Sequence, residues 1–242
     1  TEMLKGDQQY RLMAMLTETP INDIETGQYG QDAFVKKRVL EMAKKITDSK
    51  IPIYYKNISG KPFEDILSIA RRWILKHVGL KDDGIANDCL VIYDYLKLMS
   101  SENLSSDLKE YQLLGFMMTG LHNFAVRYSV PILSFIQLNR DGITKETTDI
   151  VAGSDRVLWL ASNFSIYKFK SDDEVKDTGL INGNRKLVPL KARHGAGLES
   201  GDYINMKMTG KYAKITEGKT AFEENQSEGF VVDENENSIP FN

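Results

Sequence analysis

Several residue types are scarce in this 242-residue sequence, and each scarcity narrows what the chain can be. Its one cysteine, Cys89, has no second cysteine to pair with, which fits a reducing cytoplasm. Two of its three histidines, His77 and His122, fall in expected helices, and neither has the spacing of metal ligands. No apolar run approaches the length that spans a bilayer, so no membrane partner is expected.

A large excess of positive charge is also lacking. The chain has 31 basic and 34 acidic residues, a net charge of -3, so no global basic field points to nucleic acid. The charge is uneven, because residues 219–242 hold one lysine against six acidic residues. We therefore expect one α/β domain over residues 1–218 and an acidic, disordered tail over residues 219–242.

Helical and extended patterns alternate through the first part of the chain. Apolar residues at helical spacing predict helices at 7–17, 32–49, 63–77 and 105–128. Apolar runs predict strands at 51–55, 89–94 and 130–137, and the strand–helix–strand order indicates right-handed crossovers in a parallel sheet. Later strands separated only by turns are expected to extend this sheet in antiparallel fashion, at 156–161, 165–169, 186–191, 203–208 and 212–216. The predicted fold is a central, mostly parallel sheet flanked by helices, with C-terminal antiparallel strands.

The stretch from Cys89 to Met99 is an apolar run that ends on one carboxylate, Asp94, and then becomes amphipathic. Continuous runs of this kind are typical of strands buried on both faces. Asp94 then stands at the carboxyl end of a strand, where open α/β sheets bind ligands and a carboxylate can hold Mg²⁺ on nucleotide phosphates. An aspartate that merely caps the next segment is the alternative.

Further polar positions are expected at one edge of the sheet. Gln137 ends the strand after that of Asp94, so the two side chains meet in one crevice if their strands are neighbours. Lys191 and Arg193 are two residues apart at the end of a later strand, and the period of two points both heads to one side, an anion-binding arrangement. Glu2 is the remaining candidate. Each residue taken singly can equally be an ordinary solvated side chain.

Four motifs follow one another in a familiar order. They are Thr1-Glu2-Met3 with the Gln8–Met13 helix after it, Val91–Leu98, Val130–Arg140, and Lys191-Ala192-Arg193-His194-Gly195. In this order they resemble the RecA-type motor domain of DnaB-like replicative helicases of bacteria or phages, in which they are the segment after the second core strand, the Walker B strand, the sensor strand and the arginine-finger strand. The resemblance covers the chain to about residue 217.

The resemblance implies an ATP-dependent DNA helicase that assembles as a homo-hexamer. Its cofactors would be ATP and Mg²⁺, and its partners single-stranded DNA and replisome proteins such as primase or a helicase loader. By the same resemblance, Glu2 would be the base that polarises the attacking water, Asp94 would support Mg²⁺, and Arg11 would lie at the cofactor.

The remaining roles that the resemblance implies concern communication between subunits. Gln137 would sense the γ-phosphate and relay its loss to the DNA-binding loop behind it. Arg193, helped by Lys191, would reach the nucleotide of the neighbouring subunit and stabilise charge on the transferring phosphoryl group. This agrees with phosphoryl transfer, in which positioning and electrostatics do most of the work.

The sequence departs from the family pattern at the phosphate loop. A Gly-rich turn ending in Gly-Lys-Ser/Thr should stand before Glu2, where this sequence has not begun, so the chain looks cut from something longer and should bind nucleotide poorly by itself. The triplet Gly218-Lys219-Thr220 imitates the end of that loop, but the glycine required five positions earlier is Ala213.

The second departure is the segment 141–154, where the central-channel DNA loop of the family belongs. Lys145 is its one inner positive charge, close after Arg140. Gly142 and Gly153 are small enough for backbone amides to approach phosphates, a contact that does not read sequence. We therefore expect these four residues at single-stranded DNA, with an ordinary connection between strands as the alternative.

Other functions remain possible because a fold does not determine function. A RecA/RadA-like recombinase or a clock-type ATPase would use the same fold and nucleotide chemistry. A non-catalytic replisome scaffold subunit would use the fold without the chemistry.

Overall fold

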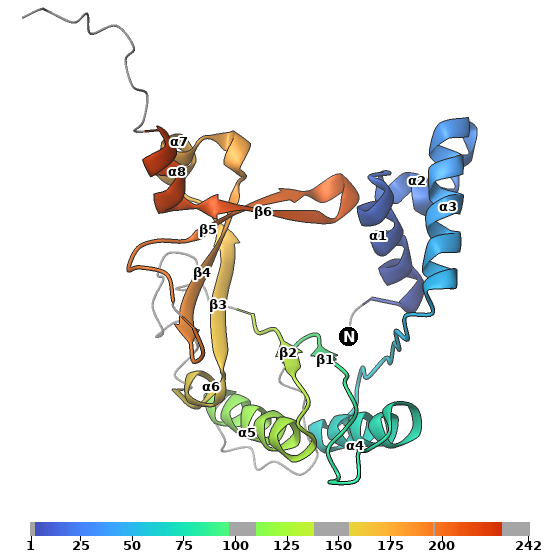
Figure 1. The fold of residues 1–242 in the computed structure, drawn as a ribbon, viewed down its shortest axis with the longest axis vertical. Coiled ribbons are helices and arrows are strands. Elements are labelled where there is room, and N and C mark those ends of the chain that lie inside the picture. Colours follow the sequence, from blue (N-terminus) through green and yellow to red (C-terminus); the bar gives the residue numbers. More distant parts are fainter. Residues whose placement is uncertain (1–2, 97–109, 138–154, 196, 229–242) are drawn as a thin grey trace, which may run out of the picture.

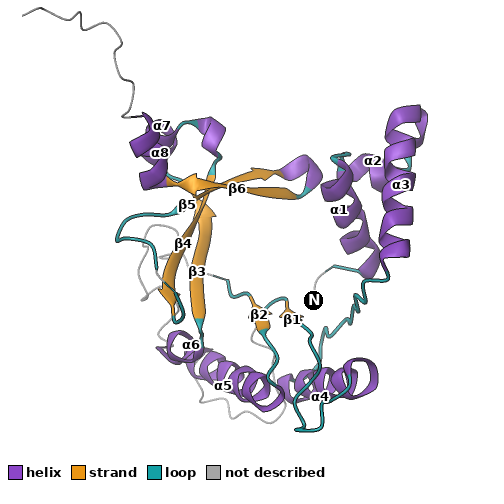
Figure 2. Ribbon diagram, in the orientation of Figure 1, coloured by secondary structure: helices purple, strands orange, loops and turns teal. Residues whose placement is uncertain are grey.

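The computed structural model describes residues 3–96, 110–137, 155–195 and 197–228 (Figure 1). Along these parts of the chain three groups of elements follow one another: a set of helices, a parallel strand pair with covering helices, and an antiparallel sheet (Figure 2). Among the helices of these parts, none combines the length and the apolar character needed to cross a membrane.

The first group is a small helical unit. It consists of α1 (Lys5–Thr17), α2 (Ile21–Thr26), the 3-10 turn η1 (Gln28–Gln31) and α3 (Ala33–Ser49). Its apolar sides meet around the buried residues Ala14, Ile24 and Val39. Asp32 begins α3, because its carboxylate accepts hydrogen bonds of 2.8 and 3.0 Å from two backbone N–H groups of the first turn. The helices expected over this part of the chain are confirmed.

The second group contains the parallel strands. Its elements are α4 (Phe63–Trp73), the π-helical turn η2 (Ile74–Val78), β1 (Val91–Tyr93), α5 (Glu110–Tyr128) and β2 (Ile132–Ser134). The two strands pair in parallel, with Val91 opposite Ile132 and Tyr93 opposite Ser134. Helices α4 and α5 lie together along the lower side of the view in Figure 1. The buried residues of this region form one core, which includes Ile58, Ile66, Tyr93, Leu96, Leu114, Met117, Leu121 and Val157.

The third group is a four-stranded antiparallel sheet with its connections. Its elements are β3 (Asn163–Phe169), α7 (Asp172–Thr178), η5 (Leu180–Asn182), β4 (Arg185–Ala192), β5 (Ile204–Thr209), η6 (Gly210–Tyr212), β6 (Lys214–Thr220) and α8 (Ala221–Glu228). The strand order is β3-β4-β5-β6. The β5–β6 hairpin reaches across to α1 (Figure 1), where Lys214 Nζ lies 2.5 Å from Glu18 Oε1. The end of the domain is therefore tied to its first helix.

A buried polar cluster lies between α7 and this sheet. Lys186, whose side chain is 2% exposed, forms an ion pair with Glu174 and lies 4.9 Å from the centre of the Tyr203 ring. Lys170 is also buried and donates a hydrogen bond of 2.8 Å to Thr178 Oγ1. Burial lowers the pKa of Lys170, because the charged ammonium loses water there. The cluster holds α7 on the sheet through charged contacts as well as apolar ones.

The strand predicted at 156–161 is wrong, because the structure forms a helix there, α6 (Asp155–Leu160). Val157 and Leu158 are both buried although they are neighbours in sequence. A strand would send consecutive side chains to opposite faces, whereas residues about 100° apart on a helix can both face a core on one side. The helix packs on α5, and the apolar run that resembled a strand is its buried side.

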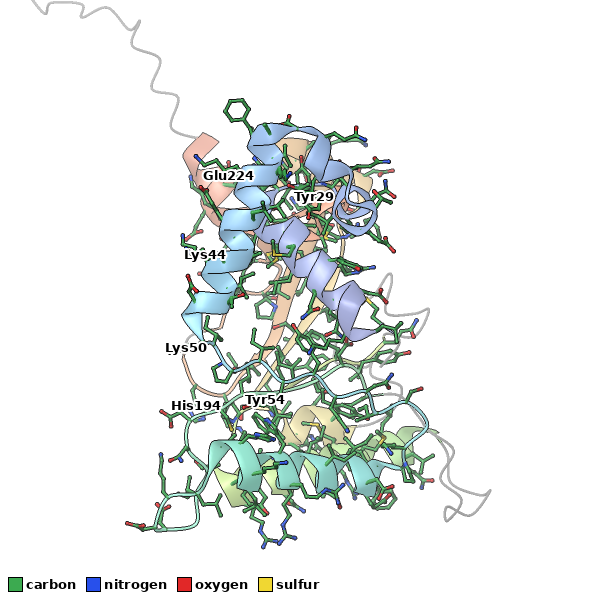
Figure 3. The ribbon with its side chains drawn as sticks, turned by 90° about the vertical axis from the view of Figure 1, so that its right-hand side faces the viewer. Tyr29, Lys44, Lys50, Tyr54, His194 and Glu224 are labelled. Carbon is green, nitrogen blue, oxygen red and sulfur yellow. The ribbon has the colours of Figure 1, made fainter. Side chains whose placement is uncertain are left out.

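The strand predicted at 51–55 is also absent from the described structure. The segment runs in extended form from Lys50, at the end of α3, toward Tyr54 beside α4 (Figure 3), and no strand is assigned to it. Tyr54 packs there on two rings, with its centroid 5.9 Å from that of Trp73 and 4.7 Å from that of His77. An apolar extended segment becomes a strand only when a partner strand accepts its backbone groups, and here aromatic contacts fix it instead.

The sheet and the tail differ from the predictions in two further ways. Within the described residues the antiparallel strands form a sheet separate from the β1–β2 pair rather than extending it. In the segment expected to be a disordered tail, β6 continues to Thr220 and α8 follows. Residues 219–228 are therefore ordered, because Tyr203 and Ala221 bury apolar surface against the sheet. The rest of the tail, residues 229–242, lies outside the described residues.

Candidate nucleotide site

Asp94 and Gln137 follow the carboxyl ends of neighbouring strands. Parallel pairing aligns Tyr93 with Ser134, and it continues past the two strands, since Leu96 N donates a hydrogen bond of 2.8 Å to Phe135 O. Asp94 and Gln137 are both exposed at this end of the pair. The sequence predicted that these strands are neighbours, and the structure confirms it. The carboxylate and the amide are thus offered to a ligand at one edge of the strand pair.

The residues around Asp94 anchor it to the core. Tyr93 before it and Leu96 after it are both 5% exposed and belong to the same apolar cluster. Burial raises the pKa of the Tyr93 phenol, so this hydroxyl stays neutral behind the carboxylate. Burial and the nearby Asp88 carboxylate likewise raise the pKa of the Cys89 thiol, which keeps it in the unreactive protonated form. Asp94 is the exposed acidic group at this strand end.

Lys191 and Arg193 point to the same side, as the period of two predicted. Lys191 Nζ donates hydrogen bonds of 2.5 Å to Leu158 O and 3.2 Å to Trp159 O. Arg193 Nη2 donates one of 2.9 Å to Trp159 O. Both cations therefore lie at the carboxyl end of α6, where the helix dipole is negative and carbonyls lack helical partners. Sequence reasoning did not find this contact, because it read α6 as a strand.

Arg11 lies in α1 and lines a cavity of about 170 Å³ between α1 and α2. Its companions in that cavity include two carboxylates, Asp7 and Glu25, and none comes from β1 or β2. The structure thus surrounds Arg11 with acidic groups, and its role at a cofactor stays a prediction.

Five of the predicted site residues lie outside the described residues. They are Glu2, Arg140, Gly142, Lys145 and Gly153. Their roles remain predictions.

The triplet Gly218-Lys219-Thr220 is not a phosphate loop in this structure. It is the end of β6, and a side chain added at Gly218 would lie 3.3 Å from Asn205 Cβ. Thr220 and Glu223 satisfy the first turn of α8 reciprocally, with Thr220 Oγ1 accepting from Glu223 N and Glu223 Oε2 accepting from Thr220 N. The N–H groups that a phosphate would need are therefore already used, as the missing glycine at Ala213 predicted.

The arrangement fits Mg²⁺ bound together with a nucleotide. Within the described ranges no group of three or more His, Cys, Asp or Glu side chains could hold a metal by itself. Mg²⁺ is usually held by one or two carboxylates together with substrate phosphates rather than by an all-protein cage. An exposed carboxylate at the end of a parallel strand, with the Gln137 amide on the adjacent strand, provides ligands of the required kind.

Comparisons with known proteins support this reading of the fold. The model of the DnaB-like helicase C-terminal domain family matches residues 1–150. Two solved structures are similar at 17% identity: a DnaB-like replicative helicase, described with its interactions with primase (TM-score 0.67, 89% of this chain and 48% of that chain), and the ATPase domain of a second protein (TM-score 0.68, 90% of this chain and 72% of that chain). The chain thus spans about half the length of that helicase. No curated protein sequence matches it.

These likenesses define the class of the protein as an α/β domain of the RecA-like type. The fold alone follows from structures at this identity, and the family follows from the sequence match. Because the family model matches more than half of its residues, the chain belongs to the DnaB-like helicase C-terminal domain family. The resemblance stated from the motifs is confirmed.

Proposed function

We propose that this chain is the motor domain of a hexameric replicative DNA helicase. It hydrolyses ATP at the contacts between neighbouring copies in a ring, moves along single-stranded DNA and separates the duplex ahead. The observation that carries the proposal is the parallel pairing of β1 with β2, which sets Asp94 and Gln137 at the carboxyl ends of adjacent strands. Membership of the DnaB-like family supports the choice of activity.

The nucleotide would be held at the edge formed by these strand ends. Asp94 would hold Mg²⁺ bound to the phosphates, and the metal would neutralise charge that develops on the transferring phosphoryl group. Gln137 would contact the γ-phosphate through its amide and pass the loss of this phosphate to the segment that follows. Glu2 would accept a proton from the attacking water. Arg11 is proposed as a more distant cofactor contact.

The neighbouring copy would complete the site. Arg193 is exposed at the end of β4 and would reach the nucleotide of the adjacent copy. An arginine supplied in this way raises the rate of phosphoryl transfer by roughly 10³- to 10⁵-fold. Hydrolysis would then depend on ring assembly, and no isolated copy would be active.

The partners follow from the same proposal. Single-stranded DNA would contact Arg140, Gly142, Lys145 and Gly153 through its phosphates, without reading sequence. Primase, a helicase loader or other replisome proteins would bind the assembled ring, as one similar helicase is described with primase.

The decisive experiment measures ATP hydrolysis stimulated by single-stranded DNA in the full-length protein. Asp94→Asn removes the proposed metal ligand, and Arg193→Ala should lower kcat by roughly 10³-fold or more. Asp88→Asn is the matched control: it removes the same charge from an exposed aspartate close to β1 and should leave kcat within about twofold, since surface charges contribute little. If both site variants retained wild-type hydrolysis and unwinding, the motor function would be wrong and a scaffold role would be favoured.

Mixing the two variants tests whether the site is shared between copies. In a mixed ring some contacts pair an intact Asp94 from one copy with an intact Arg193 from the next, so part of the hydrolysis should return. If each copy instead carried a complete site, mixing would restore nothing. A recombinase would be identified by pairing homologous strands without unwinding a fork.

A further inference from the structure

The end of α6 is held by side chains from β4. The last carbonyls of a helix lack partners within the helix and must be satisfied elsewhere. In α6, Ala161 N reaches back to Val157 O at 3.1 Å, and the next two carbonyls, those of Leu158 and Trp159, accept hydrogen bonds from Lys191 and Arg193. Two cations from one strand therefore cap one short helix.

The two cations are held differently. Lys191 is half-buried within β4 and bonds to both carbonyls, at 2.5 and 3.2 Å. Arg193 is exposed, lies just beyond β4, and its guanidinium makes one hydrogen bond to Trp159 O. An exposed single hydrogen bond is readily exchanged for water. Arg193 can therefore leave the helix end while Lys191 still satisfies both carbonyls.

Helix α6 is itself fixed to the strand that carries Asp94. Val157 is 3% exposed and lies in the same apolar cluster as Tyr93 and Leu96, the residues on either side of the carboxylate. On the outer side, the Arg156 guanidinium lies 5.7 Å from the centre of the Phe116 ring in α5. A side chain that ties the end of β4 to α6 thus ties it to the core beneath the strand of Asp94.

We propose that Lys191 is a positioning residue: it holds the end of β4 on α6 and thereby determines where Arg193 points, while Arg193 alone serves the neighbouring copy. The carboxyl end of α6 is then the resting position of the Arg193 guanidinium. The inference rests on the proposed function and changes one part of it, because the family resemblance makes Lys191 a helper at the nucleotide itself.

Two substitutions separate these roles for Lys191. Glutamine keeps an N–H donor for the carbonyls but has no charge, whereas methionine has neither. A positioning residue needs only the donor, and a group that stabilises a phosphoryl transition state needs the charge. In the full-length protein, Lys191→Met should lower kcat for ATP hydrolysis about tenfold, the effect of one lost hydrogen bond, with KM unchanged. Lys191→Gln should keep kcat within about threefold of wild type.

The control is Lys207→Met, which removes an exposed lysine from β5 of the same sheet and should change neither kcat nor KM. Melting temperatures of all three variants show whether the fold is kept. If Lys191→Gln loses as much activity as Lys191→Met, the charge acts on the nucleotide and the positioning role is wrong.

A second readout is independent of hydrolysis. Trp159 is 69% exposed at the end of α6, so its fluorescence anisotropy reports the local motion of this end. In the full-length protein with every other tryptophan replaced by phenylalanine, Lys191→Met should lower the anisotropy, and Lys191→Gln and Lys207→Met should leave it unchanged. An unchanged value for Lys191→Met would overturn the inference. A lowered value in a protein that does not hydrolyse ATP would leave the positioning role standing and reject the proposed function.

Discussion

Ser134 of β2 donates a hydrogen bond of 3.1 Å from its hydroxyl to the backbone carbonyl of Tyr93 in β1. Tyr93 is the residue directly before Asp94. A pair of strands this short has few backbone hydrogen bonds, so one side-chain bond at their ends adds appreciably to the pairing. The position of the proposed metal ligand thus depends in part on a serine that no motif singled out.

Ser134→Ala should therefore loosen the end of β1. We expect a loss of about 1 kcal/mol in the free energy of unfolding, the usual contribution of one hydrogen bond. Hydrogen exchange at the Leu96 amide, which bonds to Phe135 O across the same strand ends, should become faster. Ser165→Ala, at an exposed position of β3, is the control and should change neither quantity. Unaltered exchange at Leu96 in Ser134→Ala would contradict this role.

The ion pair between Lys186 and Glu174 should respond unequally to loss of either partner. Lys186 is 2% exposed and Glu174 26%, so a carboxylate left alone can be hydrated, whereas an ammonium left alone stays buried. Glu174→Gln should lower the free energy of unfolding by about 3 kcal/mol, and Lys186→Met by clearly less. Urea unfolding measures both. Equal losses would show that the burial of Lys186 does not decide the cost.

Stability should fall in acid because of the same pair. Burial by itself raises the pKa of Glu174, but the hydrogen bonds and charge of Lys186, with hydrogen bonds from Ser171, outweigh it and leave the pKa below the ordinary value of 4.5. The folded state then binds fewer protons than the unfolded chain, so its stabilisation is present above the ordinary pKa and is lost as pH falls through the lowered one. The free energy of unfolding should decrease from about pH 5 to about pH 3.

Two variants test the source of this pH dependence. Glu174→Gln should flatten it. Glu18→Gln should change it far less, although Lys214 also lowers the pKa of Glu18, because that pair lies in solvent and is screened. If both variants kept the full slope, other carboxylates would be responsible.

Gly183 should not tolerate a side chain. Its φ is 91°, and a Cβ there would lie 2.3 Å from Met206 O and 2.7 Å from Lys207 Cα, because the turn before β4 rests directly on the backbone of β5. Gly183→Ala should lower the free energy of unfolding by at least about 2 kcal/mol more than Gly60→Ala. Gly60 has a similar φ of 73° but open space around it, so the comparison isolates the overlap from the backbone strain. Similar losses for both variants would show that the overlap relaxes without effect.

Strand order was the most predictable part of the candidate site. An apolar run that ends on Asp94, a long helix and a second run that ends near Gln137 together imply one crossover and two parallel neighbours, which the register of β1 and β2 confirms. The common side of Lys191 and Arg193 followed in the same way from the period of a strand. Both conclusions depend only on local repeats and on the handedness of connections.

The failures share one cause. Residues 51–55 have the composition of a strand, and residues 156–161 have an apolar run of strand length, yet neither segment pairs with another strand in the described structure. Short apolar segments suit a strand or a buried helix equally well, and the surroundings decide between them. For α6 the deciding contact is with α5, which precedes it in the chain and packs along its buried side.

The order of helices and strands, the charge asymmetry and the motifs that mark the family are properties of the sequence alone, because each depends on neighbours a few residues apart. Only the tertiary structure decided that α6 is a helix, that its terminal carbonyls hold Lys191 and Arg193, and that Lys186 is buried beside Glu174. These features depend on which distant groups meet when water is excluded, and the free energy of that meeting is not encoded in any short segment.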